Sequence, residues 1–291
     1  MATTTAKPQL STSEILQKAA NRALGGGIAG AMAMGVNVTT LIWLRTTMNY
    51  QYRYGTTTTE ALKALYKEGG VLRFYKGYLP ALVQGPMSRF GDTAANTGTL
   101  ALMDSYDSTR NLPAAVKTVS ASATAAIWRI FLMPVDTLKT TMQVEGSKGV
   151  GQLAAKFKAG GPTVLYHGAL AASTATFVGH YPWFTTFNIL NARIPKYDDL
   201  PKKLMRNAFI GFCASLISDT CSNSIRVVKV YRQTHPEKVS YVNAVKGVIA
   251  EDGLAGLFGR GLKTKILANG MQGIMFSVMW RMIEDMINKD K

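Results

Sequence analysis

The residues with the clearest capacity for chemistry lie in the segment 133–143, which reads Met-Pro-Val-Asp-Thr-Leu-Lys-Thr-Thr-Met-Gln. Asp136, Lys139 and Gln143 are three and four residues apart, and this spacing places their side chains on one face of a helix. Pro134 removes a backbone donor and kinks the helix, which lipid tolerates only where neighbours satisfy the freed carbonyl. The segment therefore predicts a kinked helix that presents an acid, a base and an amide. The alternative is an ordinary helix end with a surface ion pair.

The composition favours a membrane protein with a polar interior. Of the 291 residues, 47% are hydrophobic, only 17% are charged and 27 are glycines, as is typical of packed membrane helices. The mean hydropathy is only +0.05, so the helices should carry polar faces around a water-filled interior. The net charge of +16 would suit nucleic acid or an anionic membrane surface. The basic residues are spread between apolar runs without a nucleic-acid-binding motif, so we expect no nucleic-acid partner.

The sequence offers little for enzyme chemistry. Its three histidines have no spacing typical of a metal site, and Cys213 and Cys221 lie in one apolar segment, where packing is their expected role. The glycines of 25–27 and 256–261 lack the strand–loop–helix setting of a phosphate-binding loop. We therefore expect no enzyme activity, no metal and no bound cofactor. Residues 1–17 lack a signal-peptide core, and we expect no cleavable targeting segment.

Three patterns recur with one period. Degraded copies of the segment 133–143 start at residues 40 and 224, so the spacings from residue 134 are 94 and 90 residues. A loop element ends in glycines that are 91 and 93 residues apart, at Gly77, Gly168 and Gly261. Small residues four positions apart precede each copy at the same offset, namely Gly27 and Ala31, Ala121 and Ala125, and Gly211 and Ser215. The agreement predicts three tandem repeats of about 90–94 residues.

Each repeat is predicted to contain a long helix, a loop with a short amphipathic helix, and a second long helix. Each long helix exceeds the roughly 20 residues needed to cross a hydrocarbon core of about 30 Å. We expect the long helices near 22–49, 78–104, 114–143, 170–193, 205–233 and 262–288, and the short ones near 58–67, 150–158 and 240–250. The predicted fold is an all-α membrane domain of six transmembrane helices, with a tail at 1–21 and repeats at 22–104, 114–193 and 205–288.

Six spans in three repeats, with the Pro-x-Asp-x-x-Lys element at 134–139, resemble the mitochondrial carrier family over nearly the whole chain. The resemblance implies a six-helix bundle with threefold pseudo-symmetry in the mitochondrial inner membrane. It also implies that both termini face the intermembrane space, that the short helices lie on the matrix side, and that a central cavity opens alternately to each side.

In this family, acids and bases after the prolines pair between neighbouring helices and close the matrix side. The corresponding acid positions here are Ile42, Asp136 and Arg226, the base positions are Arg45, Lys139 and Lys229, and polar brace positions follow at Asn49, Gln143 and Gln233. The resemblance then implies one surviving pair, Asp136–Lys229, with Lys139 unpaired and Arg226 facing Arg45. We expect an anion to neutralise this cluster, either an anionic lipid such as cardiolipin or a passing substrate. Alternatively, these arginines extend to the matrix interface.

The even-numbered helices of the family carry an aromatic-acid-x-x-base element that closes the cytosolic side. The first copy is lost here, the second has the amides Asn188 and Asn191, and the third has its charges reversed at Arg281 and Glu284. The resemblance therefore implies a weak cytosolic gate that hydrogen bonds hold more than ion pairs do.

Substrate positions in the family lie about midway along the even-numbered helices, here at Gln84, Thr176 and Asn269. None is charged, although relatives that move anions commonly place arginine there. Ionisable residues lie nearby at Arg89, Asp92, Arg129, His180 and Asp219. Such groups within a membrane are costly, and they are candidates for function. The arginines and His180 could hold an anionic group, while the two aspartates could meet an amine. Alternatively, Arg89–Asp92 and Arg129–Asp219 pair as structural ties.

These residues predict transport of a small anionic or zwitterionic metabolite across the mitochondrial inner membrane, with no cofactor. The alternative is a carrier fold that is retained as a structural subunit of a larger inner-membrane assembly, such as a respiratory-chain or ATP-synthase complex. The eroded gates favour the structural role, and the charged cavity residues favour transport.

Overall fold

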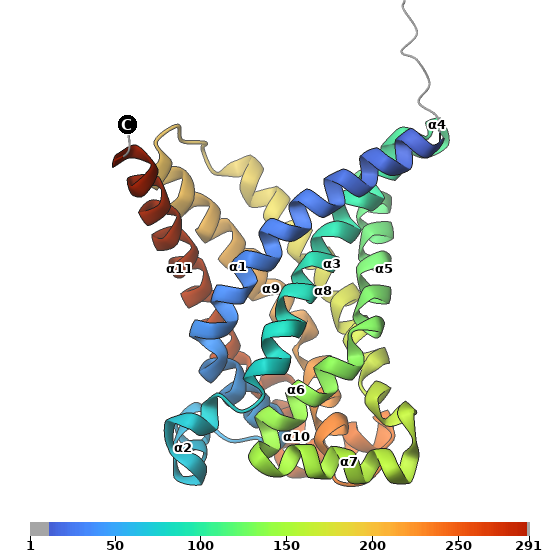
Figure 1. Ribbon diagram of the computed structural model, residues 1–291, viewed down its shortest axis with the longest axis vertical. Coiled ribbons are helices and arrows are strands. Elements are labelled where there is room, and N and C mark those ends of the chain that lie inside the picture. The colour runs from blue at the N-terminus through green and yellow to red at the C-terminus, as the bar shows by residue number, and fades with distance from the viewer. Residues whose placement is uncertain (1–11, 290–291) are drawn as a thin grey trace, which may run out of the picture.

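The computed structural model describes residues 12–289, and every regular element within them is a helix (Figure 1). The long helical segments are α1 (Thr12–Tyr54), α3 (Tyr78–Ser105), α5 (Ala114–Phe131) continued by α6 (Met133–Glu145), α8 (Ala169–Arg193), α9 (Leu200–Thr234) and α11 (Leu262–Lys289). Between them lie α2 (Thr58–Phe74), α4 (Asp107–Arg110), η1 (Gly146–Lys148), α7 (Gly149–Gly160), η2 (Pro162–Tyr166) and α10 (Tyr241–Gly259). Each predicted long or short helix therefore lies on an observed one.

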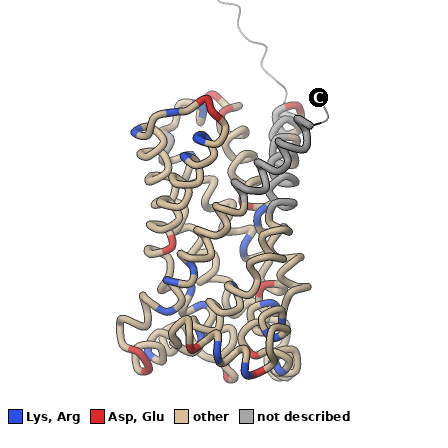
Figure 2. The backbone as a smooth tube through the Cα atoms, turned by 90° about the vertical axis from the view of Figure 1, so that its left-hand side faces the viewer, with Lys and Arg blue, Asp and Glu red and all other residues tan. Residues whose placement is uncertain are grey.

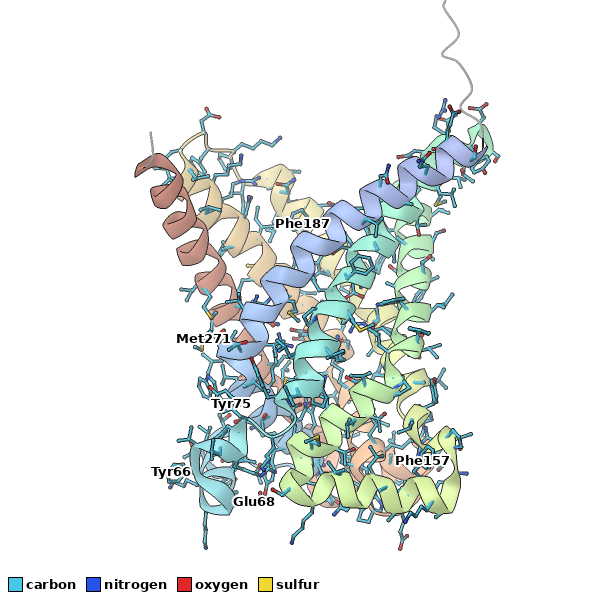
Figure 3. All side chains as sticks on the ribbon, in the orientation of Figure 1. Tyr66, Glu68, Tyr75, Phe157, Phe187 and Met271 are labelled. Atoms are coloured by element: carbon cyan, nitrogen blue, oxygen red, sulfur yellow. The ribbon has the colours of Figure 1, made fainter. Side chains whose placement is uncertain are left out.

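The short helices α2, α7 and α10 gather at one end of the bundle, which we call the loop-helix end (Figure 1). Tyr66 of α2 and Phe157 of α7 lie at this end, whereas Phe187 of α8 lies toward the opposite one (Figure 3). The long helices converge toward the loop-helix end and diverge toward the other. Most of the charged residues drawn in Figure 2 lie in the lower half of the molecule, and a second group lies at the upper rim.

The chain bends where the sequence predicts a kink. Helix α5 ends at Phe131 and α6 begins at Met133, so Pro134 lies in the first turn of α6, where its missing N–H costs little. The helical segments Val116–Phe131 and Met133–Gly160 meet at an angle of 65°. Within residues 12–289 no single helix is long and apolar enough to qualify as a membrane span, whereas this bent pair does. Six individual spans therefore stay a prediction.

The largest cluster of buried apolar side chains lies at the loop-helix end and joins all three repeats. It consists of Tyr52 on α1, Val144 on α6, Val227, Val228, Val230 and Tyr231 on α9, and Ala244, Val248 and Leu257 on α10. Burial of apolar surface is the main favourable term in folding. The bundle is therefore packed most tightly where the long helices converge.

Two buried arginines fasten the loops to the ends of long helices. Arg73 of α2 donates to the carbonyls of Gln143 and Val144 at 2.9 and 2.6 Å, and it pairs with Glu68 at 2.8 Å. Arg260, which follows α10, donates to the Arg53 carbonyl at 3.2 Å. The last carbonyls of a helix lack partners within it and attract cations. These arginines therefore cap α6 and α1, respectively.

The second repeat has a weaker version of the same clamp. Lys156 of α7 donates to the Gln233 carbonyl near the end of α9 at 3.2 Å. Burial lowers the pKa of the Lys156 ammonium, and Glu145 offsets part of this effect. Because Lys156 makes one bond to a helix-end carbonyl where Arg73 makes two, its clamp is weaker than that of Arg73. The first repeat thus holds the second, the second holds the third, and the third holds the first.

We predict that Arg73→Ala lowers the free energy of unfolding by about 3 kcal/mol, because it removes a buried charge that serves three oxygen partners. Arg110→Ala is the matched control, since the Arg110–Asp107 pair is exposed at 57% and 75%, and its loss should change stability by less than about 1 kcal/mol. Thermal unfolding in detergent measures both variants. Equal melting temperatures would contradict a role for Arg73 in holding α6.

Candidate functional site

A pocket with about 370 Å³ of empty space lies where α3, α6, α8 and α9 converge above the loop-helix end. Its polar lining residues are Gln84, Arg129, Asp136, Thr176, Arg226 and Lys229. Ala172 and Ala175 form part of its wall from α8. Three cationic side chains and one carboxylate thus line the pocket.

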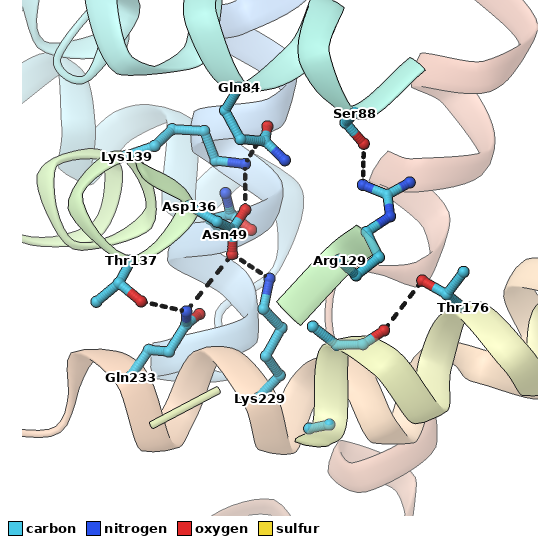
Figure 4. A network of polar contacts seen from close by, with 12 residues as sticks. Asn49, Gln84, Ser88, Arg129, Asp136, Thr137, Lys139, Thr176, Lys229 and Gln233 are labelled. Carbon is cyan, nitrogen blue, oxygen red and sulfur yellow. Dashed lines mark hydrogen bonds and ion pairs between the residues drawn. The ribbon is translucent and has the colours of Figure 1, made fainter. Parts of the chain in front are cut away.

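Asp136 occupies the centre of the polar network, and its side chain is 7% exposed (Figure 4). Its carboxylate lies 2.5 Å from the Lys229 ammonium of α9 and 2.8 Å from the Lys139 ammonium of its own helix. Lys139 also donates to Gln84 of α3 at 3.1 Å. Charge-assisted bonds of this kind are the strong ones, so Asp136 ties α6 to α9. The expectation that Lys139 is unpaired was wrong, because an acid one turn away on the same helix serves both lysines.

The brace residues link neighbouring helices next to this carboxylate. The Asn49 amide donates to Gln143 Oε1 at 2.6 Å and joins α1 to α6, while Gln233 donates to Thr137 Oγ1 at 3.1 Å and joins α9 to α6. A third link, from the Tyr52 hydroxyl of α1 to Asn223 of α9 at 3.1 Å, was missed from the sequence. Tyr52 and Asn223 belong to none of the patterns that recur in the three repeats.

Arg129 pairs with a different carboxylate from the one expected. Its guanidinium lies 2.6 Å from Asp92 of α3 and also donates to the Ser88 hydroxyl. Ser88 and Asp92 are one turn apart on the face of α3 toward α5, whereas the Arg89 side chain is exposed. The expected pairs Arg89–Asp92 and Arg129–Asp219 were therefore wrong. No ion pair within residues 12–289 includes Arg89.

Asp219 of α9 is instead bound by α11. Its carboxylate lies 2.8 Å from the Lys265 ammonium and accepts a hydrogen bond from Asn269, one of the expected substrate positions. Lys265 was missed from the sequence, although it stands four residues after the loop glycine, where the other repeats have Ala81 and Ala172. Lys265 could have been recognised from the sequence because it is charged at a position where the other two repeats have alanine.

Two arginines of the expected gate have only neutral partners. Arg226 donates to Ser222 at 3.3 Å, and Arg45 donates to Gln272 at 3.5 Å. Neither takes part in an ion pair within the described part of the chain. Both lie close enough to Lys265 to repel its ammonium. The structure records no direct contact between Arg226 and Arg45.

His180 and Thr176 lie one turn apart on α8. His180 Nδ1 lies 3.1 Å from the Ser122 hydroxyl of α5, and the imidazole meets the Phe184 ring edge-on at 5.8 Å. Thr176 Oγ1 donates to the Ala172 carbonyl at 3.0 Å while it faces the pocket. Helix α8 therefore brings a hydroxyl to the pocket, with an imidazole one turn above it.

The expected cytosolic gate is described only in part. Asn188 is exposed, and Asn191 contributes its carbonyl, which accepts a 2.7 Å hydrogen bond from the buried Arg206 of α9. The side chains of Arg281 and Glu284 lie outside the described residues. A gate at this end stays a prediction.

The model of the mitochondrial carrier protein family matches residues 17–99, 110–198 and 201–291, which is nearly the whole chain. This chain belongs to the mitochondrial carrier family. The predicted family and its three repeats are thereby confirmed, and membership implies a membrane protein that transports a solute. No curated protein matches the chain in sequence.

In this carrier, two of the three expected substrate positions meet at one pocket. Gln84 and Thr176 line it from α3 and α8, whereas Asn269 turns to Asp219. Three expected gate residues, Asp136, Arg226 and Lys229, line the same pocket. The sequence assigned substrate and gate residues to separate levels, and the structure places members of both sets around one space.

We predict that Asp136→Asn destabilises the carrier by about 3–5 kcal/mol, because it leaves two lysines without their shared carboxylate. Asp104→Asn is the control, since Asp104 pairs with Lys117 at the surface with 58% of its side chain exposed. Melting temperatures of the two variants in detergent give the comparison. Similar small shifts in both would show that Asp136 does not hold α6 to α9.

Proposed function

We propose that this carrier transports a small anionic or zwitterionic metabolite across the mitochondrial inner membrane. The observation that carries the proposal is the charge of the pocket: Asp136 pairs with Lys229 and Asp92 pairs with Arg129, which leaves Arg226 as the lining cation without a carboxylate partner among the described residues. Asp136 already serves two lysines, so it cannot neutralise Arg226 as well. An anionic group on the substrate would supply the missing charge.

The uncharged lining residues support a small substrate. Gln84 and Thr176 offer an amide and a hydroxyl from opposite sides, and Ala172 and Ala175 leave room beside them. A metabolite with one or two anionic groups and a few polar atoms would fit this lining.

We propose that the substrate crosses by alternating access. The Asp136 ties and the apolar cluster close the loop-helix end, while the long helices diverge toward the other end (Figure 1). In the family orientation the closed end faces the matrix, and this conformation would be open to the intermembrane space. Separation of Lys229 from Asp136 would then open the matrix side. Cardiolipin is a proposed lipid partner at that end.

A structural role is the second candidate. Ile42 is fully buried at a gate position where the family has an acid, and the amides Asn188 and Asn191 stand where it has charges. A carrier that no longer cycles could lose such groups. This reading predicts that the chain copurifies with a larger inner-membrane complex and transports nothing.

A thermal-shift screen with nucleotides, carboxylates, amino acids and cofactors tests the proposal. A ligand at about 100 times its Kd stabilises the folded state by about 2.7 kcal/mol, and we expect an anionic hit. Arg129→Gln should abolish the shift, and it should abolish uptake of the same ligand by liposomes that contain the purified carrier.

Arg193→Gln is the matched control, because Arg193 is exposed at the end of α8 and should leave the shift and the uptake unchanged. A well-folded protein that responds to no compound and takes up none would favour the structural role. A hit that survives Arg129→Gln would place the substrate elsewhere than this pocket.

A further inference from the structure

The three helices that converge at the loop-helix end meet at three seams, which are not bridged alike. At the α6–α9 seam, Asp136 and Lys229 form an ion pair. At the α1–α6 seam, the Asn49 side-chain amide donates a short hydrogen bond to Gln143 Oε1. The α9–α1 seam has arginine at both gate positions, Arg226 and Arg45, and thus lacks the acid that would join them.

The charges around the α9–α1 seam do not balance. On α11, Lys265 pairs with Asp219 of α9, and Gln272, two turns further on, accepts from Arg45 of α1. Arg226 lies two turns after Asp219 on α9, so the three cations belong to the same junction of α1, α9 and α11. Asp219 is already occupied, because it pairs with Lys265 at 2.8 Å and accepts from Asn269. Arg45, Arg226 and Lys265 carry three positive charges, and Asp219 carries one negative charge. Among the described residues, two positive charges at this junction are therefore left without a counter-charge.

The two arginines also have unused donors. Arg45 meets Gln272 through one nitrogen at 3.5 Å, and its Nε is buried without a hydrogen-bond partner within the described chain. Arg226 bonds only the hydroxyl of Ser222, four residues earlier on its own helix, and it also lines the pocket. A buried, unpaired charge is costly, whereas an oxyanion can satisfy two guanidinium groups at once.

We propose that the α9–α1 seam is an anion site, in which a water-soluble dianionic oxyanion seats between Arg45 and Arg226 and replaces the missing gate carboxylate. Arg226 borders the open pocket, so a soluble anion can reach it from within the bundle. The bound anion links α1 to α9 as Asp136 links α6 to α9. Without it, like charges oppose each other across the seam and weaken the closed end.

The site shares Arg226 with the proposed substrate pocket, but Arg45 does not line that pocket. Loss of the phosphate response in Arg45→Gln therefore separates this site from the proposed substrate site. The probe is inorganic phosphate, with sulfate as a second dianion and chloride at equal ionic strength as the blank. Salt screens charges in general, and the matched chloride series removes that contribution. We expect the melting temperature of the purified carrier to rise in a saturable way with phosphate and sulfate, but not with chloride.

Variants at Arg226 assign the effect to the seam. Arg226→Gln should weaken the apparent affinity for phosphate at least tenfold, whereas Arg110→Gln, at an exposed arginine outside the seam, should leave it unchanged. Arg226→Asp supplies the missing acid, so we expect a melting temperature above that of the unmodified chain without phosphate, and no further rise with it. If Arg226→Asp does not fold, Arg45→Gln provides the second test, and we expect it to weaken the response to phosphate as Arg226→Gln does.

Several results would overturn the proposal. An equal response to chloride would show screening alone, and an unchanged response in Arg226→Gln would place the anion elsewhere. Arg226-dependent stabilisation by micellar phosphatidylglycerol, without any response to free phosphate, would identify a lipid headgroup and overturn the soluble anion. Failure of the metabolite screen would leave these phosphate results intact, so the two proposals fall separately.

Discussion

A single buried carboxylate holds together the helices that converge at the loop-helix end of this carrier. Asp136 brings together α6, α9 and, through Lys139 and Gln84, α3. Burying three charged groups is favourable only when their charges compensate each other and their remaining hydrogen-bond donors and acceptors have partners. At this point of the bundle Asp136 compensates Lys229, Gln84 accepts from Lys139, and the pocket lies directly against the cluster. Any movement that separates the helices of the loop-helix end would therefore disturb the electrostatics of the pocket.

The three seams between the pseudo-symmetric helices α1, α6 and α9 differ in their chemistry. One seam has an ion pair, one has a hydrogen bond between side-chain amides, and one has an excess of positive charge. Pseudo-symmetric helices are thus joined by bonds of unequal strength and unequal sensitivity to salt. The seams need not separate together, and the weakest one would separate first. A solute with negative charge can act on that seam, because Arg226 belongs both to it and to the pocket lining.

The period of about 92 residues and the helix faces were predictable, because glycine spacing, proline position and hydrophobic runs are local features of sequence. The Asp136–Lys229 contact was predicted from the resemblance to the family, in which acids and bases after the prolines pair between neighbouring helices. Neither the pairing of Lys265 with Asp219 nor that of Arg129 with Asp92 was predictable in this way. Long side chains select partners across helices by their orientation, which spacing along one helix does not reveal.

The cyclic clamps have a consequence for biogenesis. The carbonyl end of α1 is capped by Arg260, which is 207 residues further along the chain from its acceptor Arg53. The first long helix to be synthesised thus receives its cap from one of the last loops. Contacts of such long sequence separation form slowly, because the intervening chain must first be ordered. The ring can close only after the third repeat has been made, so a chain truncated before that repeat would leave α1 without its partner and exposed to quality control.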